Sequence, residues 1–275
     1  MHPILHHPVL DIPERETVTF TYNGQRIVAR KGYTLAAALH QAGHPVHSHS
    51  LDGRGRSLEC GIGKCGACEM LVDGVVRRIC ITPVDGVHEV RELDRELPAP
   101  GLAAAAPVHH VYKTRVAIVG AGPAGLACRE QLRAFGIDCL VVDSNSSVGG
   151  QFNMQTHRFF FFEQERRFGG LRGFDIARRL AGDDRDGILN GYTVWDILEG
   201  GRLALKNLIG GDLAYIDADH LVVATGAVPF MPPFENDDLP GVYTAAVFQK
   251  MMNQEHTLLG RRVLTVGAGN IGYLT

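Results

Sequence analysis

The 275-residue sequence has no long apolar run and no excess of positive charge. No stretch approaches the roughly 18 uninterrupted apolar residues that a membrane-spanning helix needs. Twenty-seven basic and 30 acidic residues give a formal net charge of −3, so we expect neither nucleic acid nor an anionic membrane surface as a partner. The N-terminus lacks a basic segment followed by an apolar one, so the sequence predicts no secretory signal.

Cysteine is also scarce, and its distribution argues against a disulfide framework. Four of the six cysteines lie between Cys60 and Cys80, whereas Cys128 and Cys139 are distant in the sequence. A tight cluster in a chain without an export signal is typical of a metal or iron–sulfur site. We therefore expect a cytoplasmic protein in which Cys128 and Cys139 are small buried side chains.

Changes in composition and periodicity predict two domains joined by a linker. Two alternating hairpins around a short helix predict a small α+β domain, followed by a stretch rich in Pro and Ala. A buried strand, a glycine-rich turn, a helix and another strand then predict a parallel α/β sheet. The predicted segments are a flexible lead-in over 1–16, the small domain over 17–97, the linker over 98–112, the α/β domain over 113–260 and the start of a second nucleotide-binding unit over 261–275.

The clustered cysteines, Cys60, Cys65, Cys68 and Cys80, have the spacing C-x4-C-x2-C-x11-C. The first two intervals are those of plant-type [2Fe–2S] clusters, in which each iron takes two thiolates. Glycines within the loop let backbone N–H groups turn toward the sulfur atoms. A zinc ion held by four cysteines is the alternative, but zinc ribbons favour two CxxC pairs and the sequence contains one.

A G-x-G-x-x-G motif stands between a predicted strand and a predicted helix, which is the context of dinucleotide binding. Glycines allow a pyrophosphate to reach the N-terminus of the helix, where free N–H groups and the helix dipole favour an anion. Asp143 ends the next strand, where a carboxylate binds a ribose hydroxyl. The residues of the turn expected at the nucleotide are Gly120, Gly122, Pro123, Ala124 and Gly125.

The cysteine loop and the strands and helix before it resemble the ferredoxin-like β-grasp domain of amine and amino-acid dehydrogenase complexes. That family includes opine oxidases, hydrogen cyanide synthase, dye-linked proline and hydroxyproline dehydrogenases, and sarcosine oxidases. The resemblance covers residues 17–92. In sarcosine oxidases this domain lacks the full cysteine set, whereas all four cysteines are present here, so the resemblance implies a [2Fe–2S] cluster.

The same resemblance favours FAD over NAD at the first glycine motif. Gly150 and Gln151 follow the second strand, and Thr225 and Gly226 end a later buried strand, as in two-dinucleotide flavoproteins. The Asp at position 143, where Glu is more usual, keeps NAD open as the alternative.

A second strand–glycine–helix motif, with Gly267, Gly269 and Gly272, lies near the C-terminus. The resemblance implies that it opens an NAD(P)-binding domain in a longer parent protein, so we expect a C-terminally truncated chain. Residues 262–266 are predicted as a strand, and packing is expected to be poor from about residue 245 onward. The ferredoxin-like domain is expected to fold and hold its cluster alone.

The sequence therefore predicts a β-grasp ferredoxin-like α+β domain followed by an incomplete α/β Rossmann-type FAD domain. We expect an electron-transferring subunit of an FAD-dependent oxidoreductase, with an amino-acid-oxidase-like flavoprotein as its partner. The electron acceptor, the substrate and any catalytic residue are not assigned. The alternatives are the front half of an NAD(P)H:acceptor oxidoreductase, or an inactive iron–sulfur binding fragment.

Overall fold

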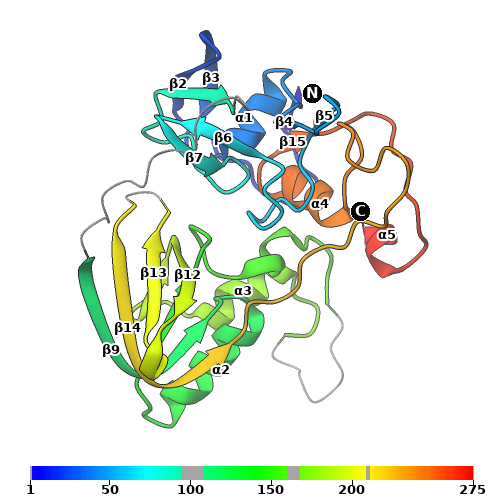
Figure 1. The fold of residues 1–275 in the computed structure, drawn as a ribbon. Coiled ribbons are helices and arrows are strands. Elements are labelled where there is room, and N and C mark those ends of the chain that lie inside the picture. Colours follow the sequence, from blue (N-terminus) through cyan, green and yellow to red (C-terminus); the bar gives the residue numbers. More distant parts are fainter. Residues whose placement is uncertain (1, 94–107, 160–167, 209–210, 275) are drawn as a thin grey trace. The chain divides into compact units, whose positions relative to one another are not determined.

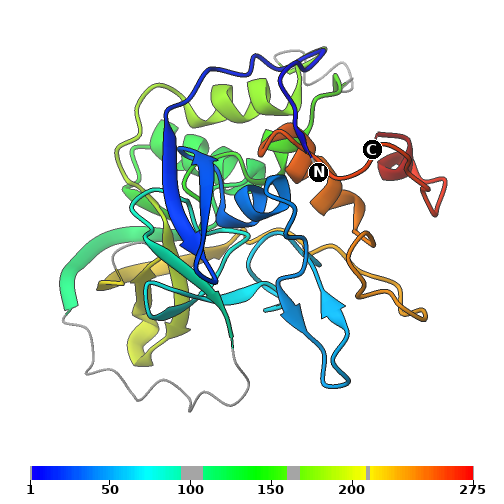
Figure 2. The same cartoon turned by 90° about the horizontal axis from the view of Figure 1, so that it is seen from above.

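The computed structural model describes residues 2–93, 108–159, 168–208 and 211–274 (Figures 1 and 2). Its contacts divide the chain into two compact units. Unit 1 combines Met1–Pro98 with Val228–Thr275, and unit 2 consists of Ala99–Ala227. In the described part of the chain, no helix has the length and hydropathy needed for a membrane span.

Unit 1 is built on a five-stranded sheet with the order β3-β2-β8-β6-β7, in which only the β2–β8 pair is parallel. Figure 2 shows the β4–β5 hairpin, in light blue, as an arm of this unit. The elements of unit 1 are β1 (His2–Pro3), β2 (Thr17–Tyr22), β3 (Gln25–Arg30), α1 (Leu35–Gln41), β4 (Ser48–His49), β5 (Gly55–Arg56), β6 (Glu69–Val72), β7 (Val75–Arg78), β8 (Glu89–Glu92), α4 (Ala245–Asn253), β15 (Thr257–Leu258) and α5 (Asn270–Leu274).

The first hairpin and the first helix form where the sequence predicts them. Asn23 and Gly24 both have positive φ, of 46° and 80°, as a tight two-residue turn requires. The Thr34 side chain caps α1 by accepting a hydrogen bond from Ala37 N at 3.3 Å. Local residue chemistry therefore accounts for the boundaries of these elements.

The core of unit 1 draws on both of its chain segments. Leu35 and Leu39 of α1 are fully buried, and they share one apolar cluster with Val247, Met251 and Leu259. Val247 and Met251 lie four residues apart on α4, so one face of this helix carries both of them. The core of the small sheet is therefore completed by residues far along the chain.

This packing differs from the predicted domain limits. The sequence places residues 228–260 in the α/β domain and predicts poor packing from about residue 245, yet 228–275 belongs to unit 1 and α4 is in its core. The physical reason is the apolar face of α4, whose Val247 and Met251 are buried in the same core cluster as α1 and the sheet. The sequence predicts neither this helix nor the core that covers it.

The segment predicted as a flexible lead-in, residues 1–16, is tied to unit 1. β1 pairs antiparallel with β15. Ile4 N donates to His256 O at 2.7 Å, and His7 Nε2 lies 3.2 Å from Asn253 Oδ1. The chain start therefore has backbone and side-chain partners in the second segment of unit 1.

Unit 2 has a six-stranded mixed sheet with the order β11-β10-β9-β14-β13-β12. The first four strands are parallel, and β13 and β12 are antiparallel to their neighbours. The predicted linker, 98–112, lies mostly outside the described residues, and residues 108–112 begin β9. The elements are β9 (Val108–Val119), α2 (Pro123–Ala134), β10 (Cys139–Asp143), η1 (Gly150–Met154), α3 (Gly173–Ala181), β11 (Ile188–Asn190), β12 (Tyr192–Ile197), η3 (Glu199–Gly201), β13 (Leu203–Asn207) and β14 (Leu213–Val223).

The two faces of β9 belong to two separate cores. Ile118 packs with Leu126 of α2 and Ile176 of α3, which lie on one side of the sheet (Figure 1). Ala117 packs with Leu205 in the second core. β10 contacts β12 although three strands separate them in the sheet order, so the sheet curls around this second core.

Two apolar segments predicted as strands are exposed, of which the first is expected to be buried and the second to be poorly packed. Leu221 and Val223, at the end of β14, are 37% and 67% exposed. Residues 262–266 form no strand, and Leu264 and Val266 are 89% and 93% exposed. None of the described strands pairs with 262–266. An apolar run becomes a strand only when a neighbour supplies the ladder of hydrogen bonds.

Candidate iron–sulfur and nucleotide sites

The four predicted cluster ligands are brought together in unit 1 by the β6–β7 hairpin. Cys68 immediately precedes β6, and Cys80 lies two residues after β7. Ile79 N donates to Cys68 O at 3.1 Å, which extends the pairing beyond the last ladder residues. The hairpin therefore holds Cys80 beside the loop that contains Cys60, Cys65 and Cys68.

Backbone N–H groups inside the loop point at the sulfur atoms. Gly63 N donates to Cys80 Sγ at 3.2 Å, and Lys64 N and Cys65 N donate to Cys60 Sγ at 3.3 and 3.4 Å. Such donors stabilise negative charge on sulfur, which is what a cluster thiolate carries. This feature of the loop fits an iron–sulfur cluster.

Glycine is required in this loop for both conformation and space. The three loop glycines all have positive φ, between 66° and 77°. At Gly63 an added Cβ would lie 2.5 Å from Ile81 Cδ1, so the Ile81 side chain would have to shift in addition to the backbone strain. The residues with this conformation are Gly61, Gly63 and Gly66.

The thiols interact in pairs. Hydrogen bonds with Cys65 and Cys80 hold the pKa of Cys60 well below its ordinary value, and the thiol of Cys80 lowers the pKa of Cys68. Contacts with Cys60 and Cys68, together with burial, raise the pKa of Cys80. Among the described residues, no three His, Cys, Asp or Glu side chains are placed to hold one metal ion. A two-iron cluster needs only two thiolates per iron, and paired sulfurs fit that requirement.

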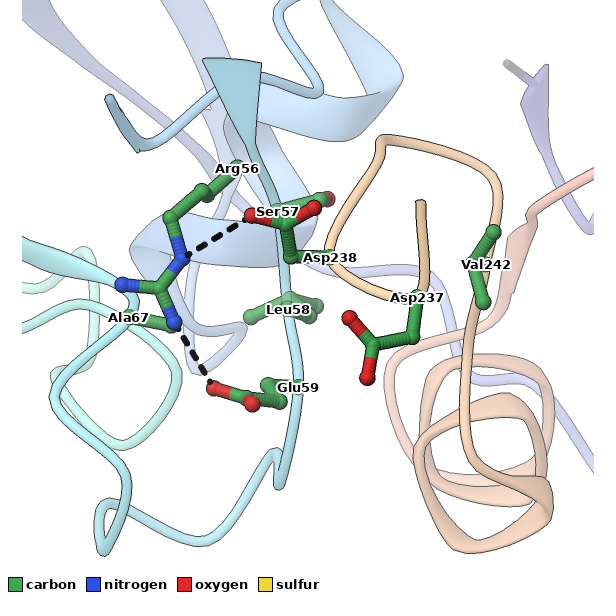
Figure 3. Close-up of a pocket in the computed structure, with 8 residues that line it drawn as sticks. All are labelled: Arg56, Ser57, Leu58, Glu59, Ala67, Asp237, Asp238 and Val242. Carbon is green, nitrogen blue, oxygen red and sulfur yellow. Dashed lines mark hydrogen bonds and ion pairs between the residues drawn. The ribbon is translucent and has the colours of Figure 1, made fainter. Parts of the chain in front are cut away.

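A small pocket lies beside the cysteine loop within unit 1 (Figure 3). Arg56 lies across it, with Nη2 3.2 Å from Glu59 Oε2 and Nε 4.0 Å from Asp238 Oδ2. Its lining comes from the segment before Cys60, from Ala67, and from the loop around residue 238. Arg56, Glu59 and Asp238 are paired with one another, so we assign this pocket no ligand.

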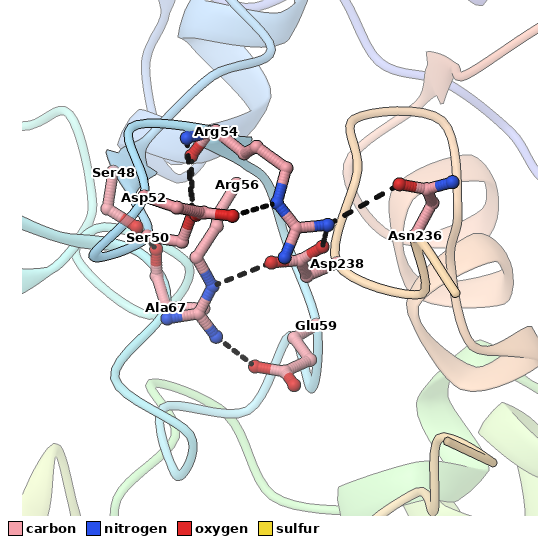
Figure 4. Close-up of polar contacts among 9 residues, drawn as sticks. All are labelled: Ser48, Ser50, Asp52, Arg54, Arg56, Glu59, Ala67, Asn236 and Asp238. Carbon is pink, nitrogen blue, oxygen red and sulfur yellow. Dashed lines mark hydrogen bonds and ion pairs between the residues drawn. The ribbon is translucent and has the colours of Figure 1, made fainter. Parts of the chain in front are cut away.

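The same loop around residue 238 is anchored by a second arginine (Figure 4). Arg54 Nη1 lies 3.6 Å from Asp238 Oδ1 and 3.4 Å from Asn236 Oδ1, while its Nε donates to Asp52 Oδ2 at 2.8 Å. These contacts tie residues 236–238 to the β4–β5 arm of unit 1. The network fixes the loop that leads into α4.

The first glycine motif of unit 2 is a turn in which backbone atoms crowd two of the three glycines. Gly120 has a φ of 112°, and a Cβ on it would lie 2.3 Å from Ala224 O. A Cβ on Gly125 would lie 1.9 Å from Gly120 O. Both positions exclude side chains because backbone atoms already occupy the space.

Gly122 is different, because nothing lies within 4 Å of the position its Cβ would take. It is the N-cap of α2, with no side-chain cap, Pro123 at the start of the helix and no acidic residue in the first turn. The N–H groups of the first turn, including those of Ala124 and Gly125, lack intrahelical partners. Open space in front of uncapped N–H groups fits a pyrophosphate.

Asp143 lies at the end of β10 and is 9% exposed. Its Oδ2 accepts from Ala121 N at 2.6 Å, and its Oδ1 accepts from Asn145 N and Nδ2 at 2.7 and 2.8 Å. A carboxylate has about four acceptor positions, so one remains for a ribose hydroxyl. Asn145 is not among the residues predicted from the sequence, although the spacing D-x-N of an Asx turn is a signal that points to it.

The later predicted residues also meet the glycine turn. Gly149 N donates to Ala121 O at 2.7 Å, and a Cβ on Gly150 would lie 3.0 Å from Gly122 Cα. Gln151 Nε2 donates to Ala227 O at 2.8 Å. The structure therefore gathers segments that are about 100 positions apart around one open space.

Thr225 and Gly226 follow the end of β14, beside β9. Ala224 N donates to Val119 O at 2.8 Å, which continues the parallel pairing beyond the strand. Gly226 has a φ of 73°, so the chain turns sharply where the sequence predicts the ATG turn. The predicted nucleotide residues from Gly120 to Gly226 thus surround one turn of unit 2.

The second glycine motif repeats the local geometry of the first. Gly267 has a φ of 109°, a Cβ on Gly272 would lie 2.6 Å from Gly267 O, and nothing lies within 4 Å at Gly269. α5 follows this turn but belongs to unit 1 and has no buried residue. The turn therefore has the shape of a nucleotide-binding turn without a described sheet behind it.

The fold and these sites define an iron–sulfur flavoprotein oxidoreductase, and comparison with known families agrees. The chain belongs to the pyridine nucleotide-disulphide oxidoreductase family, whose model matches residues 114–274. Residues 15–94 match the 2Fe-2S iron-sulfur cluster binding domain. The predicted family resemblance, the two domain types, and the pair of cofactors, a [2Fe–2S] cluster and FAD, are confirmed.

Individual proteins show the same similarity. The chain is 28% identical over 166 residues to a subunit of opine oxidase from Agrobacterium tumefaciens (strain Ach5), which covers 57% of this chain and 32% of the relative. It is 27% identical over 173 residues to the glutamate synthase (NADPH) small chain of Escherichia coli (strain K12), covering 57% and 32%. The chain thus spans about a third of the length of these curated relatives.

The fold also matches a solved structure over nearly its whole length. The crystal structure of L-proline dehydrogenase from P. horikoshii has a TM-score of 0.74 and 22% identity, and the match covers 95% of this chain and 50% of that one. This likeness concerns the fold alone.

Proposed function

We propose that this chain passes electrons between FAD and a [2Fe–2S] cluster as one component of an amine or amino-acid dehydrogenase complex. The observation that carries the proposal is the presence of both sites in one chain, a four-cysteine site with N–H groups directed at sulfur and an open glycine turn. When bound, FAD supplies two-electron chemistry and the cluster supplies one-electron transfer. The similarity to a protein named as one of the subunits of an opine oxidase supports this role.

The residues of the chain have distinct tasks in this proposal. Cys60, Cys65, Cys68 and Cys80 bind the irons. The turn Gly120–Gly125 binds the pyrophosphate through backbone N–H groups, and Asp143 accepts a ribose hydroxyl. The residues that border the same open space are Gly150, Gln151, Thr225 and Gly226.

The proposed partner is an amino-acid-oxidase-like flavoprotein subunit that oxidises the substrate and passes electrons to this chain. We place the complex in the cytoplasm, because four of the six cysteines are clustered as in a metal or iron–sulfur site and not spread as in a disulfide framework.

The test is anaerobic purification of the full chain, followed by an absorption spectrum and a reductive titration. We expect about two irons and two sulfides per chain, one FAD, and consumption of about three electrons per chain. Zinc in place of iron, or tight NAD without FAD, would contradict the proposal. A cluster without any flavin would instead favour the inactive iron–sulfur fragment.

A second candidate is the front half of an NAD(P)H:acceptor oxidoreductase, in which a nicotinamide nucleotide reduces FAD. The geometry of the second turn favours it, since Gly267 has nearly the φ of Gly120, and Gly269 has the same open Cβ position as Gly122. Addition of NADPH or NADH to the loaded chain without oxygen separates the two candidates. Bleaching of the flavin absorption would support this candidate, and an unchanged spectrum would support the role within a dehydrogenase complex.

A further inference from the structure

One face of α4 lies against the cysteine loop within unit 1. Thr244 Oγ1 donates to Glu59 O at 3.3 Å, immediately before the first cysteine. Val247 Cγ2 lies 3.2 Å from the position that a Cβ on Gly61 would take. Thr244, Val247 and Lys250 are spaced three residues apart, so they lie along the same face of the helix.

Lys250 joins the two parts of the chain that carry the cysteines. Its Nζ donates to Gly61 O at 2.6 Å and to Cys80 O at 2.9 Å. Gly61 belongs to the loop that carries three of the ligands, and Cys80 is the ligand that arrives from the β6–β7 hairpin. A single ammonium group therefore fixes the loop and the hairpin relative to each other.

The charge of Lys250 lies beside the cluster ligands, because its Nζ is 2.9 Å from the carbonyl oxygen of Cys80. A cation next to the centre stabilises negative charge added to it. Because reduction adds an electron to the cluster, the reduced state gains more from this charge than the oxidised state.

We propose that Lys250 is a positioning residue of the iron–sulfur centre, which clamps the ligand loop to Cys80 and raises the reduction potential of the cluster. The inference deepens the proposed electron transfer and rests on the cluster being bound by the four cysteines. It makes α4, which lies outside the matched cluster-binding domain of residues 15–94, part of the same centre. A higher potential favours transfer of electrons from flavin to cluster.

The experiment compares three variants of the full chain with the unchanged chain. Lys250→Met removes the charge and both hydrogen bonds, and Lys250→Arg keeps a cation of similar reach. Lys206→Met removes an exposed lysine of unit 2 and serves as the matched control. The readouts are iron content, the rate of cluster loss in the presence of a chelator, and the cluster potential from a redox titration followed by electron paramagnetic resonance.

We expect Lys250→Met to lose its cluster about 10- to 100-fold faster, the range typical for removal of outer-shell partners, and to have a more negative potential. Lys250→Arg should recover most of the potential, and Lys206→Met should match the unchanged chain. If Lys250→Met does not fold, Lys250→Gln decides, because it keeps a donor for one carbonyl but has no charge, so its potential should still fall.

An unchanged cluster lifetime and potential in the neutral variants would overturn the role of Lys250 alone. An unchanged chain that binds no iron under anaerobic conditions would overturn the proposed function instead. The two failures are therefore distinguishable by the iron content of the unchanged chain.

Discussion

The cysteine loop of unit 1 and the first glycine turn of unit 2 both place glycines at positive φ, but they present opposite chemistry to a cofactor. In the loop, backbone N–H groups support side-chain sulfurs, as Gly63 N does for Cys80 Sγ at 3.2 Å. In the turn, backbone N–H groups face the cofactor space directly, and nothing lies within 4 Å of the position that a Cβ on Gly122 would take. The loop binds its cofactor through cysteine side chains, and the turn offers backbone N–H groups and the absence of a side chain at Gly122.

This difference determines what a substitution tests at each site. In the turn, Gly120 and Gly125 are filled from behind by backbone atoms, so a side chain there damages the fold before any ligand is considered. Gly122 has a φ of −73°, which any residue adopts, and its Cβ position is free. It is therefore the position in the turn where the ligand alone opposes a side chain.

The largest expected effect is at the cysteine site of unit 1. Cys65→Ser removes one thiolate and should abolish most of the cluster signal, because an alcohol is a much poorer ligand for iron. Iron and sulfide analysis with the visible absorption spectrum gives the measurement. The matched control is Cys128→Ser on α2, which should keep the full cluster.

The second largest effect is at the first glycine turn of unit 2. Gly122→Val should prevent FAD binding while leaving the fold intact, because its methyl groups occupy the open space of the pyrophosphate. Flavin content and far-ultraviolet circular dichroism are the two measurements. Gly269→Val is the matched control, since it makes the same change in a turn of the same local shape. Equal FAD content in Gly122→Val and the unchanged chain would remove the pyrophosphate from this turn.

Local features of the sequence are enough to predict much of both sites. Asn23 and Gly24 predict a hairpin, Thr34 predicts a helix start, and the glycine motif predicts the turn before α2, because each depends on residues within a few positions. The same is true of the loop from Cys60 to Cys68. These elements form where they are expected.

The features that the sequence does not predict depend on contacts across long distances in the chain. Lys250 reaches Gly61 across 189 positions, and no local pattern distinguishes this lysine from any other. The exposed segment 262–266 shows the reverse error, since an apolar run predicts a strand but only a neighbouring strand makes one. α4 likewise shares a buried core with α1, and this long-range packing is not visible in the local pattern that predicts a small domain ending at residue 97.

Acid should destabilise unit 1 more strongly than unit 2, because buried histidines lie in unit 1. Burial lowers the pKa of His40 and of His256 to about 4, and it holds the pKa of His47 well below 6.5. The unfolded chain takes up these protons near pH 6.5, whereas the folded chain resists them down to about 4. Unfolding therefore binds protons, and the free energy of unfolding falls as pH decreases from 6.5 toward 4, by roughly 3 kcal/mol for His40 alone at the acid end.

Limited proteolysis of the full chain at pH 7 and pH 5 measures this effect in each unit. The first additional cleavages at pH 5 should fall in unit 1. Neither ring nitrogen of His47 has a hydrogen-bond partner in the described structure, so His47→Leu should reduce the acid sensitivity at small cost near pH 7. Additional cleavages confined to residues 108–227 would contradict the assignment of the acid sensitivity.

The smallest expected effect tests whether α4 belongs to the cysteine site. Thr244 caps α4 by accepting from Val247 N at 3.3 Å, and it donates to Glu59 O beside the first ligand. Thr34 caps α1 in the same way, by accepting from Ala37 N at 3.3 Å. The first turn of α1 contacts the hairpin end of the site through Ala36 N and Ile79 O, whereas the hydroxyl of Thr244 itself donates to the residue before Cys60. Thr244→Ala and Thr34→Ala should each lower stability by about 1 kcal/mol, the usual cost of a lost cap, which thermal unfolding measures. Only Thr244→Ala should also accelerate cluster loss to a chelator, by a few-fold, because it frees the chain next to Cys60, and Thr244→Ser should restore the slower rate. Equal rates of cluster loss in the two alanine variants would show that α4 supports the fold of unit 1 without supporting its iron–sulfur centre.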